Sequence, residues 1–183
     1  NFTISEITFA NIVKAGTGAK IHKNRKNHGL AIFLGGERIF YFEDKKMNVR
    51  GNTIVYFPKG SNYIIKEKIP FDCYAINFEM PDGFCFEPFA FKIKNVNTYL
   101  ENFKQSQKQQ IRKNTGYDAK IKSELYNIIY TMQTEYNLPY TNSKIIEPAI
   151  NYIHSNYYKE NISIEHLATL CGISTVHLRN TFI

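Results

Sequence analysis

The segment from Asn161 to Phe182 constrains the fold most, because its residues specify two short helices and the turn between them. Ser163 can cap a first helix, and Gly172 can end it in the left-handed conformation, which costs little only without a Cβ. Ser174 can then cap a second helix. The sequence therefore predicts a helix, a sharp turn and another helix.

Each of these predicted helices has one apolar face. Ile164, Leu167 and Ala168 share a face of the first helix, and Leu178 and Phe182 lie one turn apart on the second, where they can pack back on Leu167. Four residues of the second helix face outward: Thr175, Val176, Arg179 and Asn180. Two short helices crossing steeply with an outward face are typical of a helix-turn-helix, although an ordinary helical hairpin in a globular core is the alternative.

A supporting helix precedes this motif. Residues 145–158 are helical by pattern, because Ile146, Ile150 and Ile153 recur at steps of four and three. We expect residues 138–143, which contain Pro139 and several polar side chains, to be a linker.

The C-terminal region resembles the first half of the DNA-binding domain of AraC-type transcription regulators, through the runs AINYIHSNY, ISIEHLA, CGIS and HLRNTF. In that family two such units, joined by a long helix, insert recognition helices into two successive major-groove segments. Residues 144–183 match the first unit. The resemblance implies DNA contacts for five residues: phosphate for Thr175 and the backbone of Ser174, and base edges for Val176, Arg179 and Asn180. Arg179 is expected to read guanine bidentately.

The first ninety or so residues have the pattern of short strands. Apolar runs alternate with turn signals, and they fall at residues 30–34, 39–42, 53–57, 63–65 and 73–78. Gly35 and Gly36 suggest a tight hairpin, and Pro58 is expected at a strand end or sheet edge. Closely spaced strands of this kind predict an antiparallel barrel or sandwich.

The segment from Arg25 to Phe78 resembles the cupin-like N-terminal domain of the same AraC-type family, through NHGLAIFLGGERIFYF and GNTIVYFPKGSNY. In that family the domain commonly binds an effector or forms a dimer. Hydroxyls and a guanidinium among aromatic walls suit a small polar effector, and four residues are candidates: Arg25, Tyr41, Tyr56 and Tyr63. The alternative for each aromatic residue is core filling with its hydroxyl at the rim.

Residues 97–137 are expected to form two amphipathic helices, separated by a loop at residues 114–116. The second helix carries one apolar stripe. Two interpretations remain open, since the stripe can pack on the barrel or form a dimer seam. The seam would consist of four residues: Ile121, Leu125, Ile128 and Met132.

Metal-dependent cupin enzymes hold their ion with two His one residue apart, a nearby Glu and a later His. This sequence has no His-x-His pair, and Tyr63 stands near the place of the last His. His22 and His28 are six residues apart and are expected in loops or on the surface. No nucleophile motif or phosphate loop is present either. We therefore expect no catalytic residue, no bound metal and no cofactor, with a cupin-fold metal enzyme as the alternative.

The net charge of +7 lies mainly outside the predicted DNA-reading module. Residues 1–70 hold 12 Lys and Arg against 5 Asp and Glu, whereas residues 145–183 hold two basic residues against three acidic ones. Phosphate affinity is therefore expected to come largely from the family's other unit or from a second subunit.

The cysteine pattern and the hydropathy favour a cytoplasmic protein. Cys73, Cys85 and Cys171 are odd in number and contain no C-x-x-C pair, so we expect buried or half-buried thiols in a reducing compartment. No apolar run approaches the length of a membrane span, and no secretory signal opens the chain.

These patterns together predict an α+β protein with four parts. They are a cupin-like barrel that binds an effector (residues 1–96), a helical packing or dimerisation segment (97–137), the linker (138–143) and a partial DNA-binding domain (144–183). The predicted function is a homodimeric, sequence-specific DNA-binding regulator that responds to a small molecule. A ligand-binding or dimerisation module that does not bind DNA is a further alternative.

Overall fold

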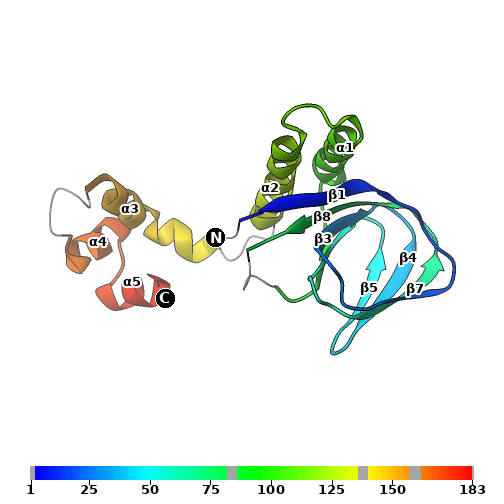
Figure 1. Ribbon diagram of the computed structural model, residues 1–183. Coiled ribbons are helices and arrows are strands. Elements are labelled where there is room, and N and C mark those ends of the chain that lie inside the picture. The colour runs from blue at the N-terminus through cyan, green and yellow to red at the C-terminus, as the bar shows by residue number, and fades with distance from the viewer. Residues whose placement is uncertain (1–2, 82–85, 136–139, 157–161, 183) are drawn as a thin grey trace. The chain divides into compact units, whose positions relative to one another are not determined.

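A computed structural model describes residues 3–81, 86–135, 140–156 and 162–182. The chain divides into two compact units, Asn1–Glu135 and Tyr136–Ile183 (Figure 1). The first unit contains nine strands and two helices among its described residues, and the second contains three helices.

The first unit is built on two antiparallel sheets. The five-stranded sheet has the order β1-β8-β3-β6-β9 and the four-stranded sheet the order β2-β7-β4-β5. The strands are β1 (Glu6–Val13), β2 (Ala19–His22), β3 (His28–Phe33), β4 (Glu37–Phe42), β5 (Lys46–Arg50), β6 (Thr53–Phe57), β7 (Tyr63–Ile69), β8 (Cys73–Glu79) and β9 (Phe89–Lys92). All pairings are antiparallel, which confirms the predicted α+β class and the antiparallel arrangement.

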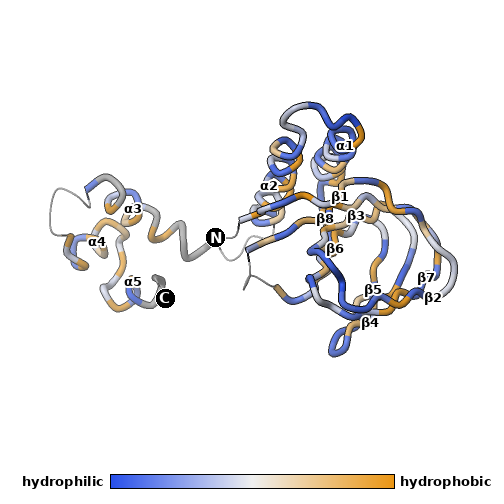
Figure 2. The backbone as a smooth tube through the Cα atoms, viewed as in Figure 1, coloured by the Kyte–Doolittle hydropathy of each residue, from blue (hydrophilic) through white to orange (hydrophobic). Residues whose placement is uncertain are grey.

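The strands differ in burial because of their places in the sheets. β3 and β6 lie inside the larger sheet and are buried along their whole length, on both faces, so their sequences are continuous apolar runs. β5 is covered on one face only, so buried and exposed side chains alternate along it, with Met47 and Val49 buried between exposed polar residues. Figure 2 shows both patterns as colour along the chain.

The predicted hairpin at Gly35 and Gly36 is wrong. β3 pairs with β6 and β8, whereas β4 pairs with β5 and β7, so these glycines connect one sheet to the other. Gly36 has a positive φ of 76°, and a Cβ there would lie 2.5 Å from the Ile69 carbonyl oxygen. Two glycines therefore indicated a sharp change of direction, but not which strand came next to which. Pro58 does follow the end of β6, as predicted.

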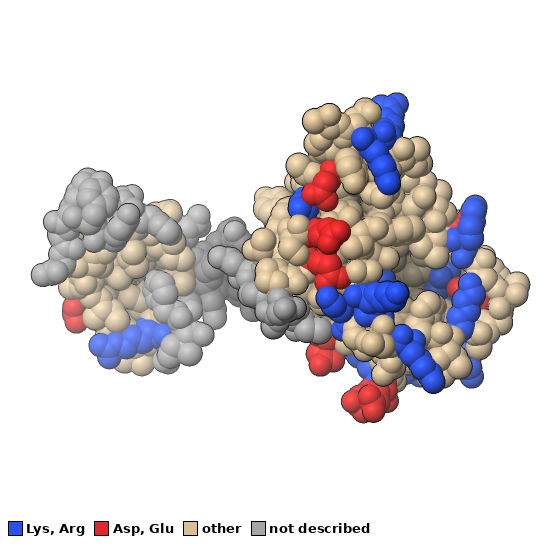
Figure 3. All heavy atoms as spheres, in the orientation of Figure 1, with Lys and Arg blue, Asp and Glu red and all other residues tan. Residues whose placement is uncertain are grey.

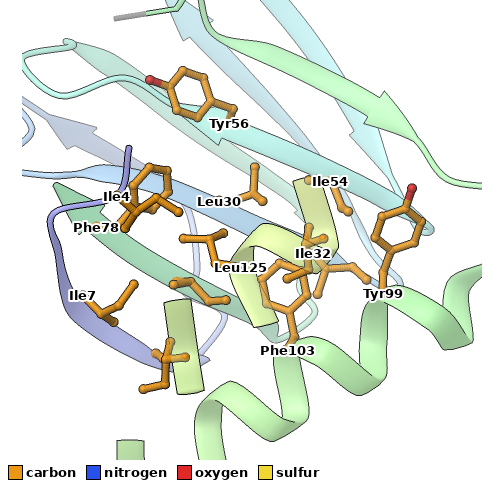
Figure 4. Packing of buried hydrophobic residues seen from close by; sticks show 14 of the residues in the cluster. Ile4, Ile7, Leu30, Ile32, Ile54, Tyr56, Phe78, Tyr99, Phe103 and Leu125 are labelled. Carbon is orange, nitrogen blue, oxygen red and sulfur yellow. The ribbon is translucent and has the colours of Figure 1, made fainter. Parts of the chain in front are cut away.

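Two helices cover the outer face of the five-stranded sheet. They are α1 (Val96–Arg112) and α2 (Tyr117–Glu135), and their apolar side chains share one core with those of the sheet. Figure 4 shows Tyr99 and Phe103 of α1 and Leu125 of α2 packed near Ile32 and Ile54. The loop between the helices falls at residues 113–116, close to the prediction, and contains Gly116 with φ +80°.

The interpretation of the α2 stripe as a dimer seam is wrong. Ile121, Leu125 and Ile128 are 0% exposed within a single chain, because they pack on the sheet and α1. Met132 is partly buried against the same core. The alternative interpretation, packing on the barrel, is what the structure shows.

The second unit consists of α3 (Tyr140–Asn156), α4 (Ile164–Cys171) and α5 (Thr175–Phe182). Because α3 begins at Tyr140, most of the stretch predicted as a linker is helical, and residues 136–139 lie outside the described residues. The core of this unit is small. Its buried members are Ile146, Ala149, Leu167, Ala168 and Leu178.

The described cysteines are free thiols. Cys73 is buried and Cys171 is half-buried, while Cys85 lies outside the described residues. Burial raises the pKa of Cys73 to about 12. No helix among the described residues combines the length and the apolar character that crossing a membrane requires.

Candidate functional site

A cavity of about 190 Å³ lies between the two sheets of the first unit. Its walls are mainly apolar and aromatic, with a few polar side chains. The apolar residues include Phe9, Leu30, Ala31, Phe33, Phe40, Phe57, Ile65 and Ala75, and the polar ones are His22, Arg25, Arg38, Tyr63 and Asn77. A concave apolar site with few converging polar groups is the usual form of a small-molecule pocket.

Arg25 stands at the centre of the polar groups. Its Nη1 donates to the Tyr63 hydroxyl at 2.8 Å, its Nη2 donates to Asn77 Oδ1 at 2.7 Å, and its Nε donates to the Asn27 carbonyl oxygen at 2.9 Å. The guanidinium also lies 5.1 Å from the centre of the Phe57 ring. These contacts fix the guanidinium against the cavity wall.

The backbone of Arg25 is held as firmly as its side chain. Its N–H donates to the Ser61 carbonyl oxygen at 3.1 Å, and its own carbonyl oxygen accepts from Gly60 N–H at 2.7 Å. Residue 29 must also be small, because a Cβ on Gly29 would lie 2.3 Å from Nη2 of Arg25. A glycine at this position therefore makes room for the guanidinium.

A second arginine of the cavity is neutralised by an acid. Arg38 on β4 forms an ion pair with Glu67 on β7 at 3.2 Å, and both side chains are almost fully buried. The guanidinium of Arg38 also lies 4.3 Å from the centre of the Phe33 ring. Tyr63 and Glu67 are four residues apart on β7, so the positions on this strand that hold the two arginines are roughly 13 Å apart.

Tyr63 joins the polar groups to the aromatic wall. Its ring stacks on His22 with centroids 4.7 Å apart, and burial raises the pKa of its hydroxyl although Arg25 opposes this shift. Burial also lowers the pKa of His22, assisted by the nearby Arg25 and Lys20. Both groups are therefore neutral at neutral pH.

The structure places only two of the four predicted effector residues in the cavity, Arg25 and Tyr63. Tyr41 lines a neighbouring shallow depression, which shares His22 and Tyr63 with the cavity, and Lys46 and Lys66 lie over its ring. Tyr56 lines a separate apolar cavity of about 190 Å³ beside Met132. Neither Tyr41 nor Tyr56 lines the cavity itself.

The expectation that His28 lies in a loop or on the surface is wrong. It is the first residue of β3 and only 3% exposed. Its Nδ1 accepts from Lys59 N–H at 3.2 Å and lies 2.8 Å from the Tyr56 hydroxyl. Because a backbone N–H can only donate, Nδ1 carries no proton and the Tyr56 hydroxyl donates to it. Burial, the largest cause, lowers the pKa of His28.

Two polar residues of the cavity, Asn77 and Arg38, are not predicted from the sequence. Asn77 shares a face of β8 with Cys73 and Ala75, at alternate positions, and all three line the cavity. This alternation was visible in the sequence, but a single asparagine at a strand end gave no chemical signal. Among the described residues, no group of three or more His, Cys, Asp or Glu side chains could hold a metal ion.

The second unit has the predicted turn between two helices. The Ser163 hydroxyl accepts from His166 N–H at 3.1 Å, and the Ser174 hydroxyl accepts from His177 N–H at 3.1 Å, so both serines cap as expected. Gly172 has φ +65°, and Ile173 N–H donates to the Ala168 carbonyl oxygen across the turn. These bonds set the direction of α5 relative to α4.

The outward face of α5 is free of the unit's own core. Val176 is 64% exposed and Arg179 is exposed, whereas Leu178 on the inner face is 1% exposed. Ser174 is exposed and Thr175 half-buried at the start of the helix. The side chain of Asn180 lies outside the described residues.

Comparisons with known proteins give structural similarity only. No family model and no curated protein matches the sequence. The apo form of a ToxT variant from Vibrio cholerae matches with a TM-score of 0.50 and 7% identity, covering 96% of this chain and 75% of that one. A cupin-2 domain protein of Shewanella frigidimarina (TM-score 0.34, 14% identity) covers 43% of this chain and 80% of that one. A variant of the Bacillus subtilis oxalate decarboxylase matches with a TM-score of 0.33 and 16% identity, covering 53% of this chain and 28% of that one.

Proposed function

We propose that this chain is a DNA-binding transcription regulator of AraC type whose barrel binds a small molecule. The observation that carries the proposal is the geometry of α4, Gly172 and α5, which buries one side of α5 and exposes the other. The fold similarity to ToxT, an AraC-family regulator, extends over both units and supports the same order of parts.

The exposed face of α5 has the size and chemistry for reading a major groove. A groove of B-DNA admits one helix, and the first turns of that helix then approach the base edges. Arg179 offers a planar pair of donors that suits O6 and N7 of guanine, and Val176 can contact a thymine methyl group. Ser174 and Thr175 stand where the helix N-terminus would approach a phosphate.

The distribution of charge indicates how DNA affinity is divided. Lys and Arg side chains are spread over the first unit, as Figure 3 shows for one face. On the described part of the second unit, Arg179 is the basic residue of α5. The proposed role of α5 is therefore base readout, with most phosphate affinity coming from elsewhere. A homodimer would need a surface other than the buried stripe of α2.

The barrel cavity is proposed as the effector site, with Arg25 and Tyr63 as its polar contacts. Their hydrogen bond, at 2.8 Å, and the apolar walls around it are the supporting observations. In this proposal the protein acts in the cytoplasm, uses no metal and catalyses no reaction.

Affinity selection from random-sequence duplexes tests the DNA-binding proposal. At about 50 mM salt, where phosphate contacts are strong, the chain should enrich a defined sequence. Arg179→Ala should then lose about 1–3 kcal/mol of preference for one base pair of that sequence. Arg112→Ala, an exposed arginine at the end of α1, is the matched control and should leave the preference unchanged. Recovery of no sequence, or equal selectivity in both variants, would refute the role of α5.

A further inference from the structure

We infer that the barrel cavity binds a small carboxylate with a compact apolar body, and that Arg25 pairs with its negative charge. This inference rests on the proposed effector site and specifies the class of its ligand. It depends on four properties of the cavity: the donors left around Arg25, the charge of its surroundings, the contrast with Arg38, and the volume.

The first property is that the side chains around Arg25 turn their acceptor oxygens toward it. A guanidinium has five N–H bonds, and three of them are used within the described residues, by Asn27, Tyr63 and Asn77. Tyr63 and Asn77 accept from Arg25, so the Tyr63 O–H and the Asn77 amide N–H bonds stay available. The cavity therefore presents donors from three side chains, which together suit an acceptor-rich anion.

The second property is the charge around the cavity. None of the described residues that line it is acidic. A polar depression adjoins it through the shared residues His22, Arg25 and Asn77, and this depression also contains Lys23 and Lys26 but no acid. The carboxylate of Glu79 is engaged by Lys59 at 2.6 Å and by the Asn27 amide. A second depression shares His22 and Tyr63 with the cavity and contains Glu43 beside Lys23. An anion that enters past Lys23 and Lys26 would meet favourable charge on its way to Arg25.

The third property is the contrast between the two arginines of the same cavity. Arg38 has its carboxylate, Glu67, at 3.2 Å, whereas Arg25 has only neutral acceptors among the described residues. A guanidinium at an apolar wall without a counter-ion leaves a site for an incoming one. The geometry thus assigns the ligand's charged end to Arg25 and not to Arg38.

The fourth property is the space beyond Arg25. The cavity measures about 190 Å³, and an apolar cavity of about 150 Å³ is known to accept benzene. Phenylalanine rings at positions 33, 40 and 57 and several aliphatic side chains line it. A single ring that carries a carboxylate matches this volume, whereas a free inorganic anion would leave the apolar walls unfilled.

Benzoate is the simplest probe of this inference, and benzamide is its uncharged analogue of nearly equal shape. In amide NMR titrations of the chain at constant ionic strength, benzoate should bind at least about tenfold more tightly than benzamide, because a charge-assisted pair is worth that much. Resonances of β7 and β8 near Tyr63 and Asn77 should shift. Inorganic phosphate should bind more weakly than benzoate.

Variants test the assignment to Arg25. Arg25→Gln should weaken benzoate binding about tenfold or more and abolish the preference over benzamide. Arg112→Gln makes the same change at an exposed site and should alter the affinity by less than about twofold, because distant exposed charges are screened. Gly29→Ala should also weaken benzoate binding, because its methyl group would displace the guanidinium.

Several results would overturn the inference. The inference fails if benzoate and benzamide bind the unaltered chain with equal affinity. It also fails if phosphate binds as tightly as benzoate, or if the Arg25→Gln variant binds benzoate as tightly as the unaltered chain. The comparison of the two ligands needs no variant, so it decides the matter even if Arg25→Gln fails to fold. Loss of DNA selectivity would leave the benzoate result unaffected, whereas failed benzoate binding with intact DNA selectivity would remove only the carboxylate assignment.

Discussion

Replacing Leu178 with Ala should unfold the second unit while the barrel stays folded. Leu178 is 1% exposed and is one of five buried side chains in this unit's core. Truncation of a buried leucine to alanine costs about 2.7–5 kcal/mol, since a cavity adds to the lost transfer free energy. A unit of about 50 residues has a total stability of only about 2–7 kcal/mol. The loss is therefore comparable to the whole stability of the unit.

The assay is amide hydrogen exchange of the full chain, followed by mass spectrometry. Peptides from α4 and α5 should lose their protection in Leu178→Ala, and peptides from β3, β6 and β8 should keep theirs. Leu170→Ala is the matched control, because Leu170 lies on α4 and is 39% exposed. It should reduce protection only slightly.

Two outcomes would refute this reasoning. If Leu178→Ala and Leu170→Ala destabilised the unit equally, the small core would not be what holds it together. If exchange in the barrel strands accelerated as much as in α5, the two units would not be independent in stability, contrary to the division at Tyr136.

Two further predictions concern backbone conformation and pH. Gly172→Ala should destabilise the second unit by about 1–2 kcal/mol through its φ of +65° alone, since a Cβ there meets no atom within 4 Å. Gly60→Ala is the control, because Gly60 has φ +78° and a Cβ there also meets no atom within 4 Å; this change should destabilise only the first unit. If either substitution reduced exchange protection equally in both units, the strain would not be confined to the unit that holds the glycine. The pKa of His28 is lowered in the folded state, so the unfolded chain takes up its proton first as pH falls below about 6.5. The stability that the neutral His28 imidazole contributes is fully present above that pH. It is lost as the pH falls through the lower pKa that His28 has in the folded state. His28→Asn, whose carbonyl can replace Nδ1 as acceptor, should lose less stability between about pH 8 and pH 5 in denaturant titrations. An unchanged pH dependence would exclude His28 as its source.

The sequence predicted those features that short-range physical rules control. The caps at Ser163 and Ser174, the left-handed Gly172 and the inner face with Leu167 and Leu178 are set within a few residues of each other, and the structure confirms them. Five strands were also predicted, because central strands are continuous apolar runs.

The features that were missed depend on contacts between distant segments. β1, β2, β5 and β9 are the four edge strands of the two sheets and carry mixed polar and apolar residues, so their pairing decides their conformation. The apolar stripe of α2 has the same sequence pattern whether it packs on the barrel or on a second copy of the chain. Only the position of the five-stranded sheet in the fold decides that it packs on the barrel.

The candidate ligand site was predicted in part for the same reason. The chemistry of Arg25 and Tyr63 predicts both as ligand contacts, and in the structure Arg25 Nη1 lies 2.8 Å from the Tyr63 hydroxyl. Asn77 and Arg38 reach the cavity because β8 and β4 place them there. The alternation along β8 indicates that Asn77 shares a face with Cys73 and Ala75, but not that this face lines a cavity. Tyr56 has the same chemistry as Tyr63, but it points to the other side of its sheet, toward Met132.

Amide exchange of the chain with and without its selected DNA duplex tests the central proposal most directly. DNA should slow exchange at the start of α5, from Ser174 to Leu178, and this protection should persist when moderate salt weakens contacts with phosphate. Protection confined to the lysine-rich surface of the first unit, lost with salt and independent of DNA sequence, would contradict a DNA-reading role for α5.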